Sequence, residues 1–173
     1  EDAASKDTIW SPSHKAALWL QPEADGKSKA QLLVVGDDGK TPTVVWKESI
    51  PTPTYALVPD TGSAIVLVDE CDSEKPNERK VLTIRDGAGK VVCEYGVKDL
   101  LSDAEVSEVM LSGKPTAPWF VQIALVPGGA ERTVVIRTTS GREVSLSLAD
   151  GKRIELTDWV KQLGSNDWGR REE

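Results

Sequence analysis

The sequence predicts a mainly β protein, made of antiparallel hairpin meanders that stack as a partial propeller-like or sandwich-like domain. Short runs of β-branched and apolar residues recur along the chain. Gly, Pro, Asp or Asn interrupts these runs about every 8 to 12 residues, which is typical of all-β proteins. The runs in the middle of the chain are apolar at successive positions, so we expect a sheet that is covered on both faces.

Length and composition favour one folded domain over residues 1–173. The chain has a mass of 18.7 kDa, 39% apolar residues and 28% charged residues, a balance found in globular proteins. No apolar run approaches the ~18 residues of a membrane span. A net charge of −7, from 21 basic and 28 acidic residues, argues against a nucleic-acid binder.

Three hairpin modules divide the chain, at about 8–47, 53–101 and 116–156. The first holds predicted strands 16–21, 31–35 and 43–46, and the second holds 55–58, 64–69, 81–85 and 91–95. The third holds 120–126, 133–138, 143–148 and 153–156. Gly39, Gly89 and Gly141 occupy the hairpin turns, where positive φ is needed. Residues 1–7 and 166–173 are expected to be flexible ends.

Two short helices are predicted, at about 102–110 and 157–163. Ser102 and Glu105 form an S-x-x-E capping box at the start of the first helix. Its apolar stripe consists of Val106, Val109 and Met110. In the second helix Thr157 is the cap, and its apolar side consists of Trp159, Val160 and Leu163. Helices this short need a sheet to dock on.

The predicted register of the middle module determines where its two cysteines lie. The turn at 86–90 places Cys93 opposite Leu82, and the loop at 70–79 places Leu82 opposite Leu67. Ile65, Leu67, Leu82 and Cys93 then share one face. Cys71 lies two strands from Cys93, beyond the reach of a disulfide. We therefore expect two unpaired cysteines, with Cys93 in the core.

The first module resembles a known repeat. In residues 8–46, Trp10, Ser11, Pro12 and Lys15 match the W-S-P-[DS]-G-K turn of Tol-type bacterial β-propellers, with Ser13 and His14 in place of Asp-Gly. Residues 33–39 match the strand and turn that follow in that repeat. Residues 53–101 resemble blade-like segments of uncharacterised exported bacterial proteins. The resemblance implies a blade-like β fold and no particular active site.

The residues give little support for catalysis or for a cofactor. His14 is the only histidine and falls in a turn, and no G-x-S-x-G motif is present. The segment 86–90 lacks the G-x-x-x-x-G-K-[ST] spacing of a phosphate loop. With two cysteines and one histidine, most zinc sites are excluded as well. We expect no catalytic residue and no cofactor, although an enzyme with an unrecognised site stays open.

An acidic loop at 69–74 is the one candidate metal site. Asp69, Glu70, Asp72 and Glu74 supply the hard oxygen ligands that Ca²⁺ prefers, but the order of an EF-hand loop is absent. The alternative is a solvated acidic loop, offset by neighbouring Lys and Arg residues.

The aromatic composition is unusual, with six Trp and one Phe. Trp19, Trp46 and Trp159 fall within strand or helix patterns and are expected in the core. Trp10, Trp119 and Trp168 fall at strand margins or in the tail. We interpret these three as candidates for a binding surface, with edge packing as the alternative.

The sequence thus favours a non-catalytic, exported β-rich interaction module that binds a protein partner. The alternative is a carbohydrate-binding or glycan-processing accessory protein that uses exposed Trp. The chain opens EDAASKDT, without an initiator Met or an apolar leader, which is typical of a mature protein after signal removal or of a trimmed chain. We therefore expect an extracytoplasmic location, periplasmic or secreted.

Overall fold

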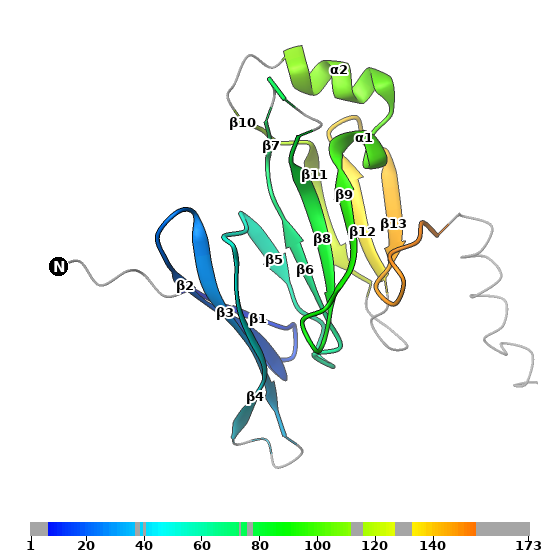
Figure 1. The fold of residues 1–173 in the computed structure, drawn as a ribbon. Helices are drawn as coiled ribbons and strands as arrows, with labels where there is room; N and C mark the ends of the chain where they lie inside the picture. Colours follow the sequence, from blue (N-terminus) through cyan, green and yellow to red (C-terminus); the bar gives the residue numbers. More distant parts are fainter. Residues whose placement is uncertain are drawn as a thin grey trace, which may run out of the picture.

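The fold is mainly β, as predicted, with three larger antiparallel sheets standing in succession (Figure 1) and a small two-stranded sheet among the described residues. It is taken from a computed structural model, which describes residues 7–36, 39, 41–72, 74–75, 78–111, 116–126 and 133–154. Every strand pair in these ranges is antiparallel. The three larger sheets follow one another along the chain, and a two-stranded sheet joins residues 71–72 to residues 116–117.

The first sheet is a meander of four strands in the order β1-β2-β3-β4. These are β1 (Asp7–Trp10), β2 (Ala16–Pro22), β3 (Lys27–Val35) and β4 (Pro42–Pro51). Residue alternation along β2 buries Ala16, Leu18 and Leu20 on one face. A bulge in β4 shifts the register between Leu32 and Leu33 of β3.

The middle sheet has the order β5-β6-β8-β9. Its strands are β5 (Tyr55–Leu57), β6 (Ala64–Val68), β8 (Lys80–Asp86) and β9 (Val91–Gly96). All five residues of β6 are buried, so this sheet is covered on both faces, as expected. In the connection from β6 to β8, the short β7 (Cys71–Asp72) pairs with β10 (Thr116–Ala117).

The third sheet has the order β11-β12-β13, with β11 (Phe120–Leu125), β12 (Thr133–Thr138) and β13 (Glu143–Ser147). Arg153 adds an isolated bridge to Leu146. Of the strand predicted at 153–156, only residues 153 and 154 lie within the described ranges.

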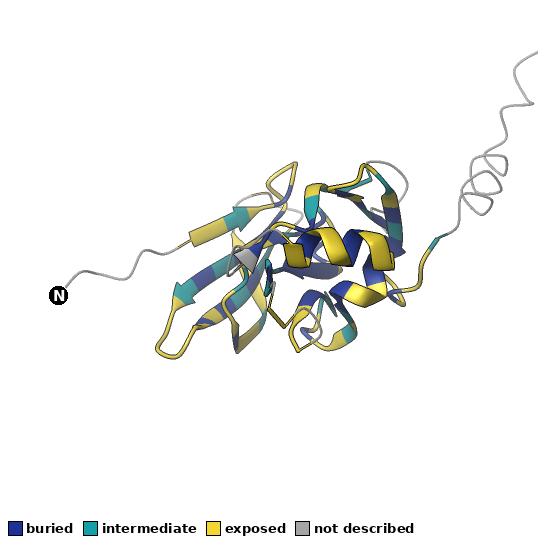
Figure 2. Cartoon of the chain, turned by 90° about the horizontal axis from the view of Figure 1, so that it is seen from above, coloured by how far each residue is buried: buried dark blue, intermediate teal, exposed yellow. Residues whose placement is uncertain are grey.

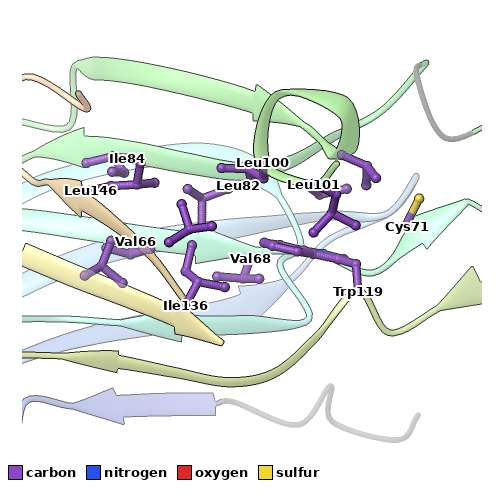
Figure 3. Packing of buried hydrophobic residues seen from close by; sticks show 14 of the residues in the cluster. Val66, Val68, Cys71, Leu82, Ile84, Leu100, Leu101, Trp119, Ile136 and Leu146 are labelled. Carbon is purple, nitrogen blue, oxygen red and sulfur yellow. The ribbon is translucent and has the colours of Figure 1, made fainter. Parts of the chain in front are cut away.

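Two hydrophobic cores lie on opposite faces of the middle sheet. The first core packs β2, β3 and β4 against Ile65 and Leu67 of β6. The second core packs Val66 and Val68 of the same strand against the third sheet and Trp119 (Figure 3). Because β6 contributes to both cores, the three sheets form one packed unit.

The predicted register of the middle sheet is wrong by one residue between β6 and β8 and by two residues between β8 and β9. Leu82 pairs with Val68 instead of Leu67, and Cys93 pairs with Ile84 instead of Leu82. A one-residue shift moves every side chain to the other face. Leu82 and Cys93 therefore join the second core, and Ile65 and Leu67 belong to the first. Register shifts within the β8–β9 pair account for part of the difference.

Two helices, α1 (Val97–Leu100) and α2 (Asp103–Leu111), lie across one end of the stack (Figure 2). The prediction of 102–110 is confirmed for α2. Its capping box is also confirmed, because Glu105 Oε2 accepts from Ser102 N at 2.8 Å and Ser102 Oγ accepts from Glu105 N at 3.4 Å. Met110 departs from the predicted stripe, since it is 49% exposed.

The sequence did not predict α1, whose start is fixed by Asp99 Oδ2 accepting from Gly96 N at 2.7 Å.

Two further predictions concern the C-terminal part of the chain, and one concerns its N-terminal end. The helix predicted at 157–163 and the flexible end at 166–173 lie outside the described residues. Of the flexible end predicted at 1–7, the structure describes only Asp7, and this residue begins β1. Within the described ranges, neither helix has the length and apolar character to cross a bilayer.

Candidate binding groove

An apolar groove of about 320 Å³ lies where the first strands of the three larger sheets meet. Its walls are Ile9, Trp10 and Pro12 from the first sheet, residues 56–58 from β5 and its end, and residues 123–125 from β11. The strands β1, β5 and β11 are edge strands of their sheets. The groove is therefore built from three sheet edges that are far apart in the sequence.

Turn residues beside the groove hold the first and middle sheets together. Ser11 Oγ accepts from the backbone N–H groups of Lys15 at 3.1 Å and Ala16 at 3.0 Å, which fixes the turn after β1. Ser13 N donates to Asp60 Oδ1 at 2.7 Å, across 47 positions of sequence. Burial alone would raise the pKa of Asp60, but hydrogen bonds from Ser13 and Ser11 outweigh it and keep this pKa below its ordinary value.

Trp10 is the exposed aromatic side chain of the groove. Its side chain is 48% exposed, and its ring lies 5.5 Å from the ring of His14, with 35° between the planes. His14 occupies the turn with φ of 58°, a left-handed conformation. This arrangement agrees with the expectation that Trp10 lies on a surface, and it gives His14 a stacking role beside Trp10.

Two further aromatic residues stand just before the groove residues of β5 and β11. Tyr55 and Phe120 meet edge to face, with ring centroids 5.6 Å apart. Tyr55 is 51% exposed, and neither of the two rings lines the groove itself. Such an edge-to-face pair holds two aromatic rings in a defined geometry.

The expectation of a binding surface at Trp119 is wrong, because its side chain is fully buried. The ring packs in the second core (Figure 3), and its Nε1 donates to the carbonyl oxygen of Asp69 at 2.8 Å. Trp119 falls at the margin of a predicted strand, so the sequence did not indicate this contact with Asp69, which lies 50 positions away. The third candidate, Trp168, lies outside the described residues.

The tryptophans expected in the core also differ from one another. Trp46 is half-buried against the first core, and the guanidinium carbon of Arg85 lies 5.7 Å from its ring centroid. Trp19 is half-buried but alternates with the core residues Leu18 and Leu20, so it lies on the opposite face of the first sheet. The expectation of a core position is wrong for Trp19. Trp159 lies outside the described residues.

The acidic loop does not gather its carboxylates at one point. Asp69 Oδ1 accepts from Thr54 N at 3.1 Å and lies 3.6 Å from Arg79. Asp72 Oδ1 accepts from the backbone N–H groups of Glu74 at 2.9 Å and Lys75 at 3.1 Å. Among the residues that the structure describes, no three acidic, His or Cys side chains are placed to hold a metal ion, and this includes Asp69, Glu70, Asp72 and Glu74.

Glu105 of α2 is a buried titratable group with several hydrogen-bond donors around it, and it is 4% exposed. Its Oε2 accepts from Arg142 at 2.8 Å, and its Oε1 accepts from Thr138 at 2.7 Å and from Ser140. Arg142 also donates to the carbonyl oxygen of Leu100 at 2.6 Å. Both carboxylate oxygens of Glu105 therefore accept hydrogen bonds from other residues of the protein. The group therefore fastens the helices to the β12–β13 hairpin.

Sequence reasoning found only Trp10 among the groove residues. The other walls come from edge strands of the middle and third sheets, and a single sequence does not reveal which edges meet. One signal was available: β11 reads FVQIAL, an uncharged strand without Pro that begins a module. Edge strands usually carry charge or Pro, so this strand is unusual for an edge.

The fold and the groove together define the class as a stacked antiparallel β protein with an apolar surface groove. Comparison with known protein families and with curated proteins finds no match for the chain.

Proposed function

We propose that this protein is a non-catalytic interaction module that binds a protein partner in the groove between β1, β5 and β11. The observation that carries this proposal is the convergence of three sheet edges around one accessible apolar groove. Small apolar pockets with rigid walls are typical of ligand and peptide sites. Here all three walls belong to strands that the two cores hold in place.

The groove is large enough to contribute useful affinity. Burying one Val, Leu, Ile or Phe side chain of a partner stabilises a complex by about 1.5–3 kcal/mol. The half-exposed ring of Trp10 adds an amphipathic aromatic surface, the kind of residue that dominates many protein interfaces. Two or three such contacts supply about 3–9 kcal/mol before the entropy of association is subtracted, so micromolar binding needs further contacts along the groove.

We also propose a relation to Tol-type β-propeller repeats and a location outside the cytoplasm. The resemblance of residues 8–46 to those repeats supports both. The relation has additional support from the two four-stranded antiparallel sheets, because propeller blades are four-stranded sheets. Fractionation of the native cells with an antibody against the chain tests the location. Recovery in the cytoplasmic fraction would contradict it.

The partner-binding proposal is tested with a phage-displayed library of random twelve-residue peptides panned on the full chain. We expect enrichment of peptides rich in apolar residues. The variant Trp10→Ala should weaken the selected peptides about tenfold or more, which is the loss expected for a central aromatic contact. Ala124→Phe, which places a ring in the groove, should weaken them as well.

A matched control is Val45→Ala. Val45 is also 48% exposed, but it lies on β4 away from the groove. Thermal melts of the three variants are the control that each one folds. The proposal fails if no peptide is enriched, or if Val45→Ala weakens binding as much as Trp10→Ala does.

A second candidate function is carbohydrate binding, favoured by the exposed ring of Trp10. Indole rings stack on the apolar faces of sugars. Of the three Trp residues suggested for such a role, the structure places Trp10 at a surface and Trp119 in the core. A glycan panel read by intrinsic Trp fluorescence tests this candidate. A shift that Trp10→Ala removes supports it, and no shift with any sugar rejects it.

A further inference from the structure

We propose that the partner enters the groove as an extended strand, which pairs with the free edge of β11. This inference rests on the proposed function and specifies the occupant: a polypeptide segment with apolar side chains at alternate positions and basic residues outside the groove. Four features of the described residues support it.

The first feature is the unpaired main chain of β11. This strand pairs with β12 on one side, and no strand in the described ranges pairs with its other side. Val126 N donates to Thr133 O at 3.0 Å, next to the end of the strand. Main-chain groups of an antiparallel strand alternate in direction. The N–H and C=O groups of Ile123 and Leu125 therefore point away from β12, towards the free edge.

The second feature is the composition of this edge. β11 has six residues, FVQIAL, with no charge and no Pro. Natural proteins place charged residues or Pro on exposed edge strands, because edges without them pair with other chains. The first sheet shows this protection at its β4 edge, where Pro42, Lys47 and Pro51 occur. The unprotected edge of β11 is therefore a suitable place for strand addition.

The third feature is the length of the neighbouring edges. β1 has four residues and is followed closely by Pro12, and β5 has three residues. Neither offers a run of pairing groups comparable with that of β11. At about 3.3 Å per residue, a strand of five or six residues matches β11 along its whole length. The side walls from β1 and β5 are then free to receive its side chains.

The fourth feature is charge. All residues that line the groove are uncharged, whereas the whole chain carries a net charge of −7. A segment with basic residues on both sides of an apolar stretch complements this distribution. Such complementarity raises the rate of association, and added salt screens it.

The test uses a library of nine-residue peptides with two lysines at each end. Their five central positions alternate Val, Ile, Leu or Phe with Ser, Thr or Gln. A control library has the same composition but groups the three apolar residues together. We expect selective enrichment from the alternating library and weaker binding at high salt. The strongest binder is then N-methylated at each backbone nitrogen in turn.

Strand addition predicts a two-residue period in this scan. N-methylation at alternate positions should lower affinity about tenfold or more, because it removes an N–H donor and places a methyl group against β11. The intervening positions should change affinity less than about threefold. Hydrogen exchange measured by NMR should show new protection of the Ile123 and Leu125 amides in the complex.

The outcomes separate this inference from the proposed function. If peptides bind and Trp10→Ala removes binding, but the scan has no two-residue period and neither amide is protected, strand addition is wrong and the groove remains the binding site. If neither these libraries nor the random library yields a groove-dependent binder, both proposals are overturned.

Discussion

At the scale of single residues, Glu105 makes the contacts on which the placement of the helices depends. Its carboxylate is almost fully buried and accepts hydrogen bonds from Ser102, Thr138, Ser140 and Arg142. Burial would raise the pKa of Glu105, but these hydrogen bonds outweigh it and hold the pKa far below the ordinary value of 4.5. The charged form of Glu105 therefore stabilises the folded state.

We predict that Glu105→Gln lowers the free energy of unfolding at pH 7 by about 2 kcal/mol. The expected loss of stability is moderate because the Arg142 side chain is 38% exposed, so water still solvates its charge when the Glu105 charge is removed. The wild-type contribution is complete above pH 4.5 and is lost as the pH falls below that value, since the unfolded state then binds the proton. Urea denaturation at pH 7 and pH 3 measures both effects. The exposed Glu108→Gln, on the same helix, is the control, and an equal loss in both variants would contradict the prediction.

The two cysteines provide a second prediction at this scale. Both are unpaired, and burial raises the pKa of the Cys71 thiol to about 11 and also raises that of Cys93. A thiol with a raised pKa holds little of the reactive thiolate at neutral pH. We expect almost no reaction with a thiol reagent in the native protein and two reacting thiols after denaturation. A denatured chain with no free thiol would contradict the structure.

At the scale of elements, the hairpin turn between β8 and β9 contacts the first sheet. Arg85 of the middle sheet donates to Glu48 Oε2 at 2.8 Å and to Gly89 O at 2.7 Å, and its guanidinium lies over the ring of Trp46. Gly89 has φ of +83°, and a Cβ there would lie 1.6 Å from Nε1 of Trp46. The turn needs Gly for its conformation and for its close contact with Trp46.

We predict that Gly89→Ala destabilises the protein by about 3 kcal/mol, from backbone strain and from the clash with Trp46. Gly141 is a matched control, because its φ is +87° and nothing lies within 4 Å of an added Cβ. Gly141→Ala should lose only about 1 kcal/mol, from strain alone. Chemical denaturation of the two variants gives the difference. Equal losses would show that the turn does not pack on Trp46.

Elements with a local signal were predictable from the sequence. The capping box of Ser102 and Glu105 predicted the start of α2, and the turn glycines predicted the hairpins. The register of β6 against β8 was not predictable, because the connection between them contains β7, which pairs with the distant β10. The register of β8 against β9 was also predicted wrongly, although one turn joins them, because the pair contains two register shifts.

At the scale of the whole molecule, β6 connects the two cores. Leu18 belongs to the first core and Leu146 to the second, and both are fully buried. We predict that Leu18→Ala and Leu146→Ala each lower the free energy of unfolding by about 3 kcal/mol. Both variants should keep a single transition, because β6 couples the cores. Denaturation followed by circular dichroism and fluorescence tests this, and an early, separate loss of the first sheet would contradict it.

The groove could not be predicted from the sequence, for a physical reason. The groove joins Ile9, Trp10 and Pro12 to residues 56–58 and 123–125, and these come together only because both cores place the sheets side by side. The sequence identifies an apolar strand, but it does not show whether a neighbouring sheet covers it. The stacking of sheets was predictable from the apolar character of β6, and the meeting of their edges was not.

The most direct test of the groove as the binding site is an NMR titration of the labelled chain with a selected peptide. The proposed function predicts that the largest changes in amide chemical shift lie at Ile9, Trp10, residues 56–58 and residues 123–125. Two other exposed apolar surfaces serve as internal controls, Met110–Leu111 on α2 and Val44–Val45 on β4. Changes concentrated at either of these surfaces, with the groove residues unaffected, would contradict the account.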